Sequence, residues 1–196
     1  MKKMIFFNLI FLLIAFCVYS QDVNDAKNSF QISAGKGKYT YNLPSPSHFS
    51  LTFDYLRKLN TSFETGLTFN IIDYYIANDL LIIEKNTGLS FNYFLINKSK
   101  VYLSFGTGLL GFYTKSSMAD NFPSCLVSII NNYNFGYQLN SSFGFNLTKN
   151  LSLFLNYKVI DKLIDNDIFK LEYGSINYYI SDAAKNEINL GLKVRF

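Results

Sequence analysis

The sequence is dominated by a two-residue alternation in which an apolar side chain is followed by a small polar one. This is the period of a β-strand with one apolar face, because successive side chains point to opposite sides of a sheet. No segment between the alternating stretches has the helical period. The stretches cover residues 30–35, 49–55, 63–71, 87–95, 101–109, 133–147, 151–159 and 188–196. The sequence therefore predicts an all-β fold of eight strands.

The polar face of these strands is unusual for a water-soluble protein. It consists of Ser, Asn, Thr, Gln and Gly, and charged residues make up only 16% of the chain, whereas soluble domains carry roughly 25%. Small side chains fit the narrow interior of an eight-stranded barrel, and a closed sheet pairs every backbone polar group, as lipid requires. We therefore expect an eight-stranded, antiparallel, up-and-down transmembrane β-barrel. A soluble β-sandwich or soluble barrel is the alternative.

The connections between the predicted strands alternate in length. Three are short polar turns, at residues 60–61, 97–100 and 148–150. Four are longer loops, at residues 40–47, 73–84, 115–130 and 161–185. Membrane barrels have short turns on the periplasmic side and longer loops outside. With eight strands, both chain ends fall on the short-turn side.

The amino terminus resembles a secretory signal peptide. Lys2 and Lys3 form a positive start, residues 4–18 form an apolar run, and Ser20 suits cleavage before Gln21. The alternative is an uncleaved anchor, but the run is shorter than the about 20 residues of a membrane-spanning helix. A lipoprotein would acylate Cys17, and the bulky Phe16 before it argues against that. We expect a signal peptide over residues 1–20 and one exported barrel domain over residues 21–196.

Cysteine content and charge exclude several function classes. Cleavage leaves Cys125 as the one cysteine, so no intramolecular disulfide is predicted. Loss of Lys2 and Lys3 lowers the formal charge from +4 to +2, too small a bias to indicate nucleic acid. Zinc spacings and nucleotide fingerprints are absent, and we interpret residues 35–38 (Gly-Lys-Gly-Lys) as the end of the first strand. We therefore expect no cofactor, no metal and no nucleic-acid partner.

The last predicted strand resembles the β-signal that the barrel-assembly machinery recognises. Gly191, Val194 and Phe196 occupy its glycine, hydrophobic and aromatic positions. With the strand pattern, they make residues 21–196 similar to the small outer-membrane barrels of the OmpA-transmembrane-like and OmpX-like families. Gln21 and the Asn-, Lys-, Ile- and Tyr-rich composition look closest to the Bacteroidota outer-membrane β-barrel group. The resemblance implies an outer-membrane location, lipid contact and assembly by that machinery.

Several charged residues fall on the face that is predicted to line the lumen. A buried charge is costly unless it is paired, so we expect ion pairs and hydrogen bonds that fill the interior. The residues are Asp54, Glu64, Lys158, Glu187, Lys193 and Arg195. The leading hypothesis is therefore a non-enzymatic barrel with a structural, adhesive or partner-binding role. A narrow, porin-like channel for ions or small solutes is the alternative.

His48 and Ser50 form a His-x-Ser sequence similar to that of outer-membrane lipid A 3-O-deacylases. In that family the histidine is the base, the serine the nucleophile and a glutamate the orienter, a part that Glu64 on the next strand could take. Leu51 departs from the asparagine of the family pattern, and the pair lies early in the chain. The alternation also directs both side chains into the lumen, away from lipid. Lipid A hydrolysis is therefore the third hypothesis.

The predicted outer loops contain many aromatic and aliphatic residues, especially over residues 74–81 and 169–179. One interpretation is that strands continue beyond the membrane as a protruding hairpin. The other is that these residues form an adhesive or partner-binding surface, because exposed apolar patches often mark contacts.

Overall fold

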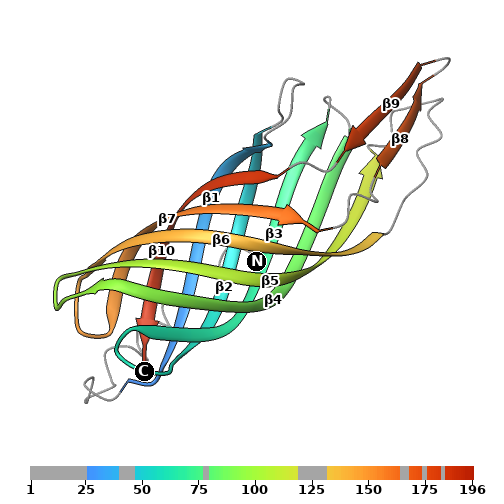
Figure 1. The fold of residues 1–196 in the computed structure, drawn as a ribbon. Helices are drawn as coiled ribbons and strands as arrows, with labels where there is room; N and C mark the ends of the chain where they lie inside the picture. The colour runs from blue at the N-terminus through green and yellow to red at the C-terminus, as the bar shows by residue number, and fades with distance from the viewer. Residues whose placement is uncertain are drawn as a thin grey trace, which may run out of the picture.

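Eight strands pair in chain order and close into a barrel (Figure 1). Each neighbouring pair is antiparallel, and β1 closes the sheet against β10. The barrel strands are β1 (Asn28–Tyr39), β2 (Ser47–Lys58), β3 (Phe63–Ile76), β4 (Leu80–Asn97), β5 (Val101–Met118), β6 (Asn132–Asn146), β7 (Leu151–Lys162) and β10 (Lys185–Arg195). The predicted eight-stranded, antiparallel, up-and-down barrel is confirmed.

The computed structural model describes residues 26–39, 47–76, 80–118, 132–163, 168–173, 176–181 and 184–196. The predicted signal peptide, Cys17 and Cys125 lie outside these residues. Within the described ranges, no helix has the length and apolar character needed to cross a membrane.

The short turns and the two ends of the barrel sheet lie together. The turns after β2, β4 and β6 are closed by hydrogen bonds from the amides of Leu59, Lys98 and Leu147, each 2.9 Å long. At the same end, the amides of Asn28 and Phe196 donate to each other's carbonyls at 3.0 and 2.9 Å. The longer connections leave from the opposite end, as the sequence predicts.

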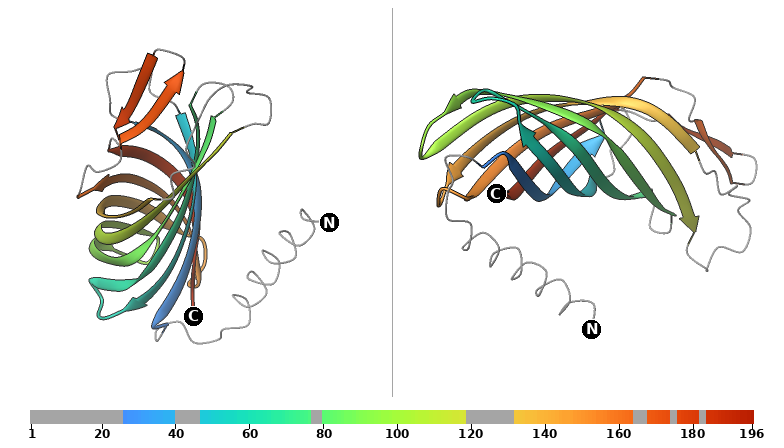
Figure 2. Two further views of the ribbon diagram at one scale, coloured as in Figure 1. Left: turned by 90° about the vertical axis from the view of Figure 1, so that its right-hand side faces the viewer. Right: turned by 90° about the horizontal axis from the view of Figure 1, so that it is seen from below.

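The predicted long loops contain more strand than expected. Residues 161–185 include β8 (Ile168–Tyr173) and β9 (Ile176–Ser181), which pair as a separate hairpin at the long-loop end (Figures 1 and 2). The prediction of a loop over residues 73–84 is wrong, because β3 continues to Ile76 and β4 begins at Leu80. The polar residues Asp73 and Glu84 suggested a loop, yet both are paired within the sheet.

Burial in the barrel is inverted relative to that of a soluble protein. Polar side chains such as Ser50, Asn70 and Asn189 are completely buried on the inner face, whereas Leu109 and Leu190 are 63% and 58% exposed on the outer face. Soluble folds place large apolar residues inside. Aromatic side chains on the outer face, among them Tyr55, Phe63 and Phe145, lie near strand ends, where membrane barrels carry aromatic girdles. The outer face is therefore a surface suited to hydrocarbon.

Two threonine hydroxyls on the outer face have backbone partners. Thr65 Oγ1 donates to the carbonyl of Ser90 at 3.0 Å, and Thr87 Oγ1 donates to the carbonyl of Thr68 at 3.2 Å. A hydroxyl without a partner in hydrocarbon is costly, so these contacts make the outer face compatible with lipid.

We predict that replacing outward-facing Leu155 by arginine destabilises the folded barrel by about 2–4 kcal/mol, because the charge lies near the middle of the lipid-facing band. Leu155 is 51% exposed near the centre of β7. The matched control is Leu59→Arg in the short turn, where the same change costs about 0–1 kcal/mol. Urea unfolding in phospholipid vesicles measures both. Equal losses for the two variants would contradict the membrane band.

Candidate functional site: the barrel lumen

The lumen is the candidate site, and four groups of contacts cross it. At the long-loop end, Lys185 Nζ lies 2.5 Å from both carboxylate oxygens of Glu84. Lys162 Nζ lies 3.6 Å from Glu84 Oε2, and these three side chains are at most 3% exposed. Both ammonium groups also lie over the ring of Phe112, at 5.5 and 5.6 Å from its centroid. This group joins β4, β7 and β10.

The second group connects β2 with β10 across β1. His48 Nε2 lies 3.1 Å from Glu187 Oε1, and Ser50 Oγ donates to Asn189 Oδ1 at 2.9 Å. Asn189 Nδ2 in turn donates to Glu187 Oε2 at 3.3 Å. These four side chains therefore form a continuous polar ladder over the inner face of β1.

Glycines in β1 make that ladder possible. Gly35 lies between Ser50 and Asn189 in the sheet register, and Gly37 lies between His48 and Glu187. A Cβ at Gly37 would overlap the His48 ring, and one at Gly35 would overlap the Asn189 side chain. The Gly-Lys-Gly-Lys sequence therefore belongs to β1, where its two glycines leave room for side chains of the flanking strands.

The third group surrounds Lys158 near the middle of the barrel. Its Nζ donates to Thr52 Oγ1 and to Asn70 Oδ1, each at 2.9 Å, and the ammonium reaches from β7 to β2 and β3. Asn70 Nδ2 continues to Asn86 Oδ1, and Asn86 Nδ2 reaches Glu84 Oε1 at 3.5 Å. Lys158 is 1% exposed. This group therefore connects the middle of the lumen to the long-loop end.

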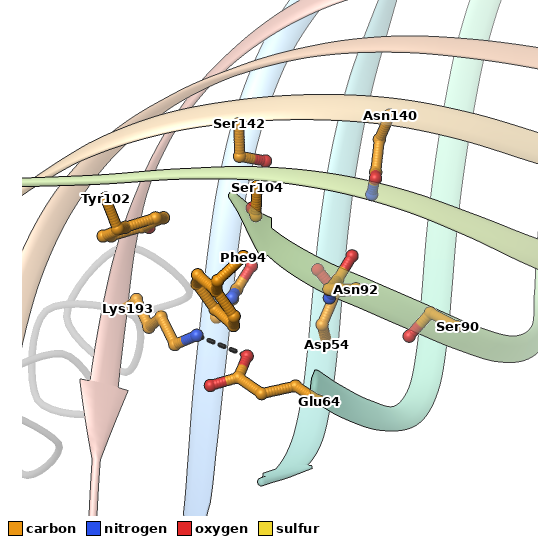
Figure 3. Close-up of a pocket in the computed structure, with 11 residues that line it drawn as sticks. Asp54, Glu64, Ser90, Asn92, Phe94, Tyr102, Ser104, Asn140, Ser142 and Lys193 are labelled. Carbon is orange, nitrogen blue, oxygen red and sulfur yellow. Dashed lines mark hydrogen bonds and ion pairs between the residues drawn. The ribbon is translucent and has the colours of Figure 1, made fainter. Parts of the chain in front are cut away.

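The fourth group closes the lumen toward the short-turn end (Figure 3). Lys193 Nζ lies 2.6 Å from Glu64 Oε2 and 5.0 Å from the centroid of the Phe94 ring. The Phe94 and Tyr102 rings meet edge to face at 5.7 Å, and Phe154 belongs to the same buried cluster. Aromatic faces attract cations, so the rings and the ammonium group form one plug.

Two predicted lumen residues lie beside this plug. Arg195 stacks over Tyr102 at 5.8 Å and donates from Nη2 to Asn146 Oδ1 at 3.1 Å. Asp54 lines a cavity of about 10 Å³ together with Asn92 and other polar groups. A cavity must offer roughly 10–15 Å³ to hold one water molecule. The cavity therefore has room for one water at most.

The six predicted lumen residues are brought to the inner face but not into one cluster. Glu64 pairs with Lys193, whereas Glu187 pairs with His48. The sequence analysis missed Glu84, Lys162 and Lys185 because it placed all three in the predicted loops 73–84 and 161–185. The signal was available, since Glu84 continues the inward series Asn86, Gly88 and Ser90, and Lys185 precedes Glu187 at the strand period.

The hypothetical trio of His48, Ser50 and Glu64 does not form. Glu64 lies at the plug with Lys193, and the acidic partner of His48 is Glu187. Ser50 donates its hydroxyl to Asn189 rather than to the imidazole. In the part of the chain that the structure describes, no group of three or more His, Cys, Asp or Glu side chains is placed to hold a metal ion.

Comparison with known proteins gives a match in fold. No protein-family model matches the chain, and no curated protein does. Neisserial surface protein A is similar with a TM-score of 0.64 at 17% identity, covering 86% of this chain and 97% of that one. OprG from Pseudomonas aeruginosa gives 0.54 at 12% identity, with 87% and 97% covered. Ail of Yersinia pestis gives 0.50 at 15% identity, with 87% and 99% covered.

The fold is that of the small eight-stranded outer-membrane β-barrels. Of these solved structures, OprG is described as an outer membrane protein. The match shows the fold, and the outer-membrane location of this chain stays a prediction. The narrower resemblance to the Bacteroidota group and export by a signal peptide stay predictions.

We predict that Glu64→Leu destabilises the barrel by about 3–5 kcal/mol, because it leaves the Lys193 ammonium buried without its carboxylate. The double variant Glu64→Leu with Lys193→Met should recover most of that loss, since apolar replacement of both partners of a buried pair is often neutral. Unfolding free energies of the two variants in the same vesicles measure the difference. If the single variant is as stable as the double variant, the pairing across the lumen is wrong.

Proposed function

We propose that this protein is an outer-membrane barrel with a closed lumen and a structural, adhesive or partner-binding role. The side-chain bridges across the lumen carry the proposal. They occur at each level from Glu84 to Glu64 and join strands on opposite sides of the barrel. A lumen filled in this way holds the barrel rigid and leaves the rims and the outer face for contacts with other molecules.

The same contacts argue against the two alternatives. A permanent channel needs a continuous aqueous path, whereas the Lys193–Glu64 pair and the surrounding rings occupy the lumen. A lipid hydrolase needs an activated serine within reach of lipid, whereas Ser50 is completely buried and donates to Asn189. The proposal is therefore non-enzymatic and non-conducting.

The barrel-assembly machinery is the partner that we propose for the last strand. Phe196 is 48% exposed next to Tyr55, with ring centroids 6.5 Å apart, and Val194 lies on the same outer face. Gly191 faces inward against Phe154 and Ser33, where a Cβ would collide. The exposed aromatic end would be available for recognition, while the glycine lets β10 pack in the finished barrel.

The filled lumen predicts that the protein does not conduct ions across a membrane. Purified full-length barrel in a planar lipid bilayer should give no stable unitary current steps. The triple variant Phe94→Ala, Tyr102→Ala and Lys193→Ala should give small steps, because it removes the plug at the short-turn end. Heat-modifiable migration on a gel checks that both proteins are folded. Stable steps from the unmodified protein would support the channel instead.

An adhesive role predicts that the β8–β9 hairpin is needed for binding but not for the barrel. Replacing residues 164–183 by a short Gly-Ser turn should abolish adhesion of expressing cells or partner capture, and heat-modifiable migration should persist. The matched control shortens residues 119–131, another long connection at the same end. Unchanged adhesion after removal of the hairpin would exclude it as the binding element.

A further inference from the structure

The short-turn rim of the barrel carries a concentrated positive charge. The segment before β1 and each of the three short turns carry at least one exposed cationic side chain. These residues are Lys27, Arg57, Lys58, Lys98, Lys100 and Lys149. We call these six residues the basic collar. They carry six positive charges in a chain whose formal charge is +4, so the rest of the chain is net negative.

Within the residues that the structure describes, acidic side chains do not balance the collar. The described stretches 26–28, 57–62, 97–100 and 147–150 contain no Asp or Glu. The nearby carboxylate of Glu64 points into the lumen, where Lys193 pairs with it. Among the described residues, none of the six collar side chains forms an ion pair. The opposite end differs, because exposed Lys36 and Lys85 there are accompanied by Asp73 and Asp161 on the outer face.

Hydrogen bonds hold the connection points of the collar in a rigid ring. Asn97 Nδ2 donates to the carbonyl of Thr61 at 3.0 Å, which joins the turn after β4 to that after β2. Asn146 Nδ2 donates to the carbonyl of Lys98 at 3.1 Å, and Arg195 Nη1 donates to that of Lys149 at 3.4 Å.

The ring is completed where β1 and β2 meet. The amide of Lys58 donates to the carbonyl of Lys27 at 2.7 Å, and the amide of Phe196 ties β10 to β1 at Asn28. The charged turns are thus positioned before any partner binds, which lowers the entropic cost of binding.

Apolar residues within the turns indicate the depth of the collar in the membrane. Leu59, directly after Lys58, is 61% exposed, and Leu147, close to Lys149, is 59% exposed. The outward aromatic residues Tyr55 and Phe145 lie next along the flanking strands. Lysine and arginine keep their stems on apolar surface while the charged ends reach polar surroundings. In a bilayer, we therefore expect the charged ends of the collar residues to lie at the level of the lipid head groups.

We propose that the basic collar binds the phosphate head groups of anionic phospholipids in the periplasmic leaflet. The proposal rests on the outer-membrane placement of the barrel, in which short turns are periplasmic. Clustered Lys and Arg next to a membrane attract anionic lipids, and the exposed leucines in the turns hold the collar at that surface. A site for an anionic cell-wall polymer would instead need cationic side chains that extend beyond the apolar band into the periplasm.

Lipid retention tests the proposal directly. The full-length protein is refolded into nanodiscs of equal amounts of phosphatidylcholine and phosphatidylglycerol, and native mass spectrometry identifies the lipids that remain bound. The collar variant carries Lys58→Gln, Lys100→Gln and Lys149→Gln. The matched control removes three exposed lysines from the other end, with Lys36→Gln, Lys38→Gln and Lys85→Gln. Heat-modifiable migration verifies that each barrel is folded, which separates this test from the test of the barrel itself.

We expect the unmodified protein and the control to retain phosphatidylglycerol over phosphatidylcholine by about fivefold or more, the preference that one cation near an anionic surface confers. The collar variant keeps Lys27, Arg57 and Lys98, so it should show a clearly smaller preference for phosphatidylglycerol than the control does. High salt should weaken the preference of every variant because it screens exposed charges. An unchanged preference in the collar variant, or an equal loss in the control, would overturn the proposal. So would collar-dependent cosedimentation with purified cell-wall polymer combined with no lipid preference.

Discussion

The pairing of β1 with β10 is the interaction on which the rest of the structure depends. It runs from Ser29 opposite Arg195 to Tyr39 opposite Lys185 and turns an open eight-stranded sheet into a closed one. An open sheet would present two rows of unpaired amides and carbonyls to hydrocarbon, where each unsatisfied group costs several kcal/mol. Closure also defines an inside and an outside, so the simple alternation along each strand becomes a separation of polar lumen from apolar belt.

The lumen is a polar core in which glycines leave space for larger side chains of the neighbouring strands to contact one another. Gly35 and Gly37 have no side chains, so His48 and Ser50 of β2 reach Glu187 and Asn189 of β10 over them. A buried ion pair is weak evidence of net stability, because desolvation offsets much of the attraction. Its clearer effect is on specificity, since a strand that slipped by one residue would turn every such side chain toward lipid.

The proposed non-conducting role places the function of this barrel at its surfaces, because side-chain contacts fill the lumen. The apolar belt is a surface suited to hydrocarbon, the long-loop end carries the β8–β9 hairpin, and the short-turn end carries the basic collar. Eight strands leave just enough interior for side chains, so a barrel of this size gains polar contacts inside without gaining a pore. Among the described residues, the two rims are chemically different, with mixed charge at the long-loop end and positive charge at the short-turn end.

The sequence by itself determined the number of barrel strands, their antiparallel order and the face on which Glu64, Lys158 and Lys193 lie, because a period of two residues is a local property of a strand. It misjudged residues 73–84, where Asp73 and Glu84 looked like loop residues although the alternation continues through them. The partners of the buried charges were decided only in the tertiary structure. His48 meets Glu187 across a sequence separation of 139 residues, and that meeting depends on the register and closure of the whole barrel, which no local pattern records.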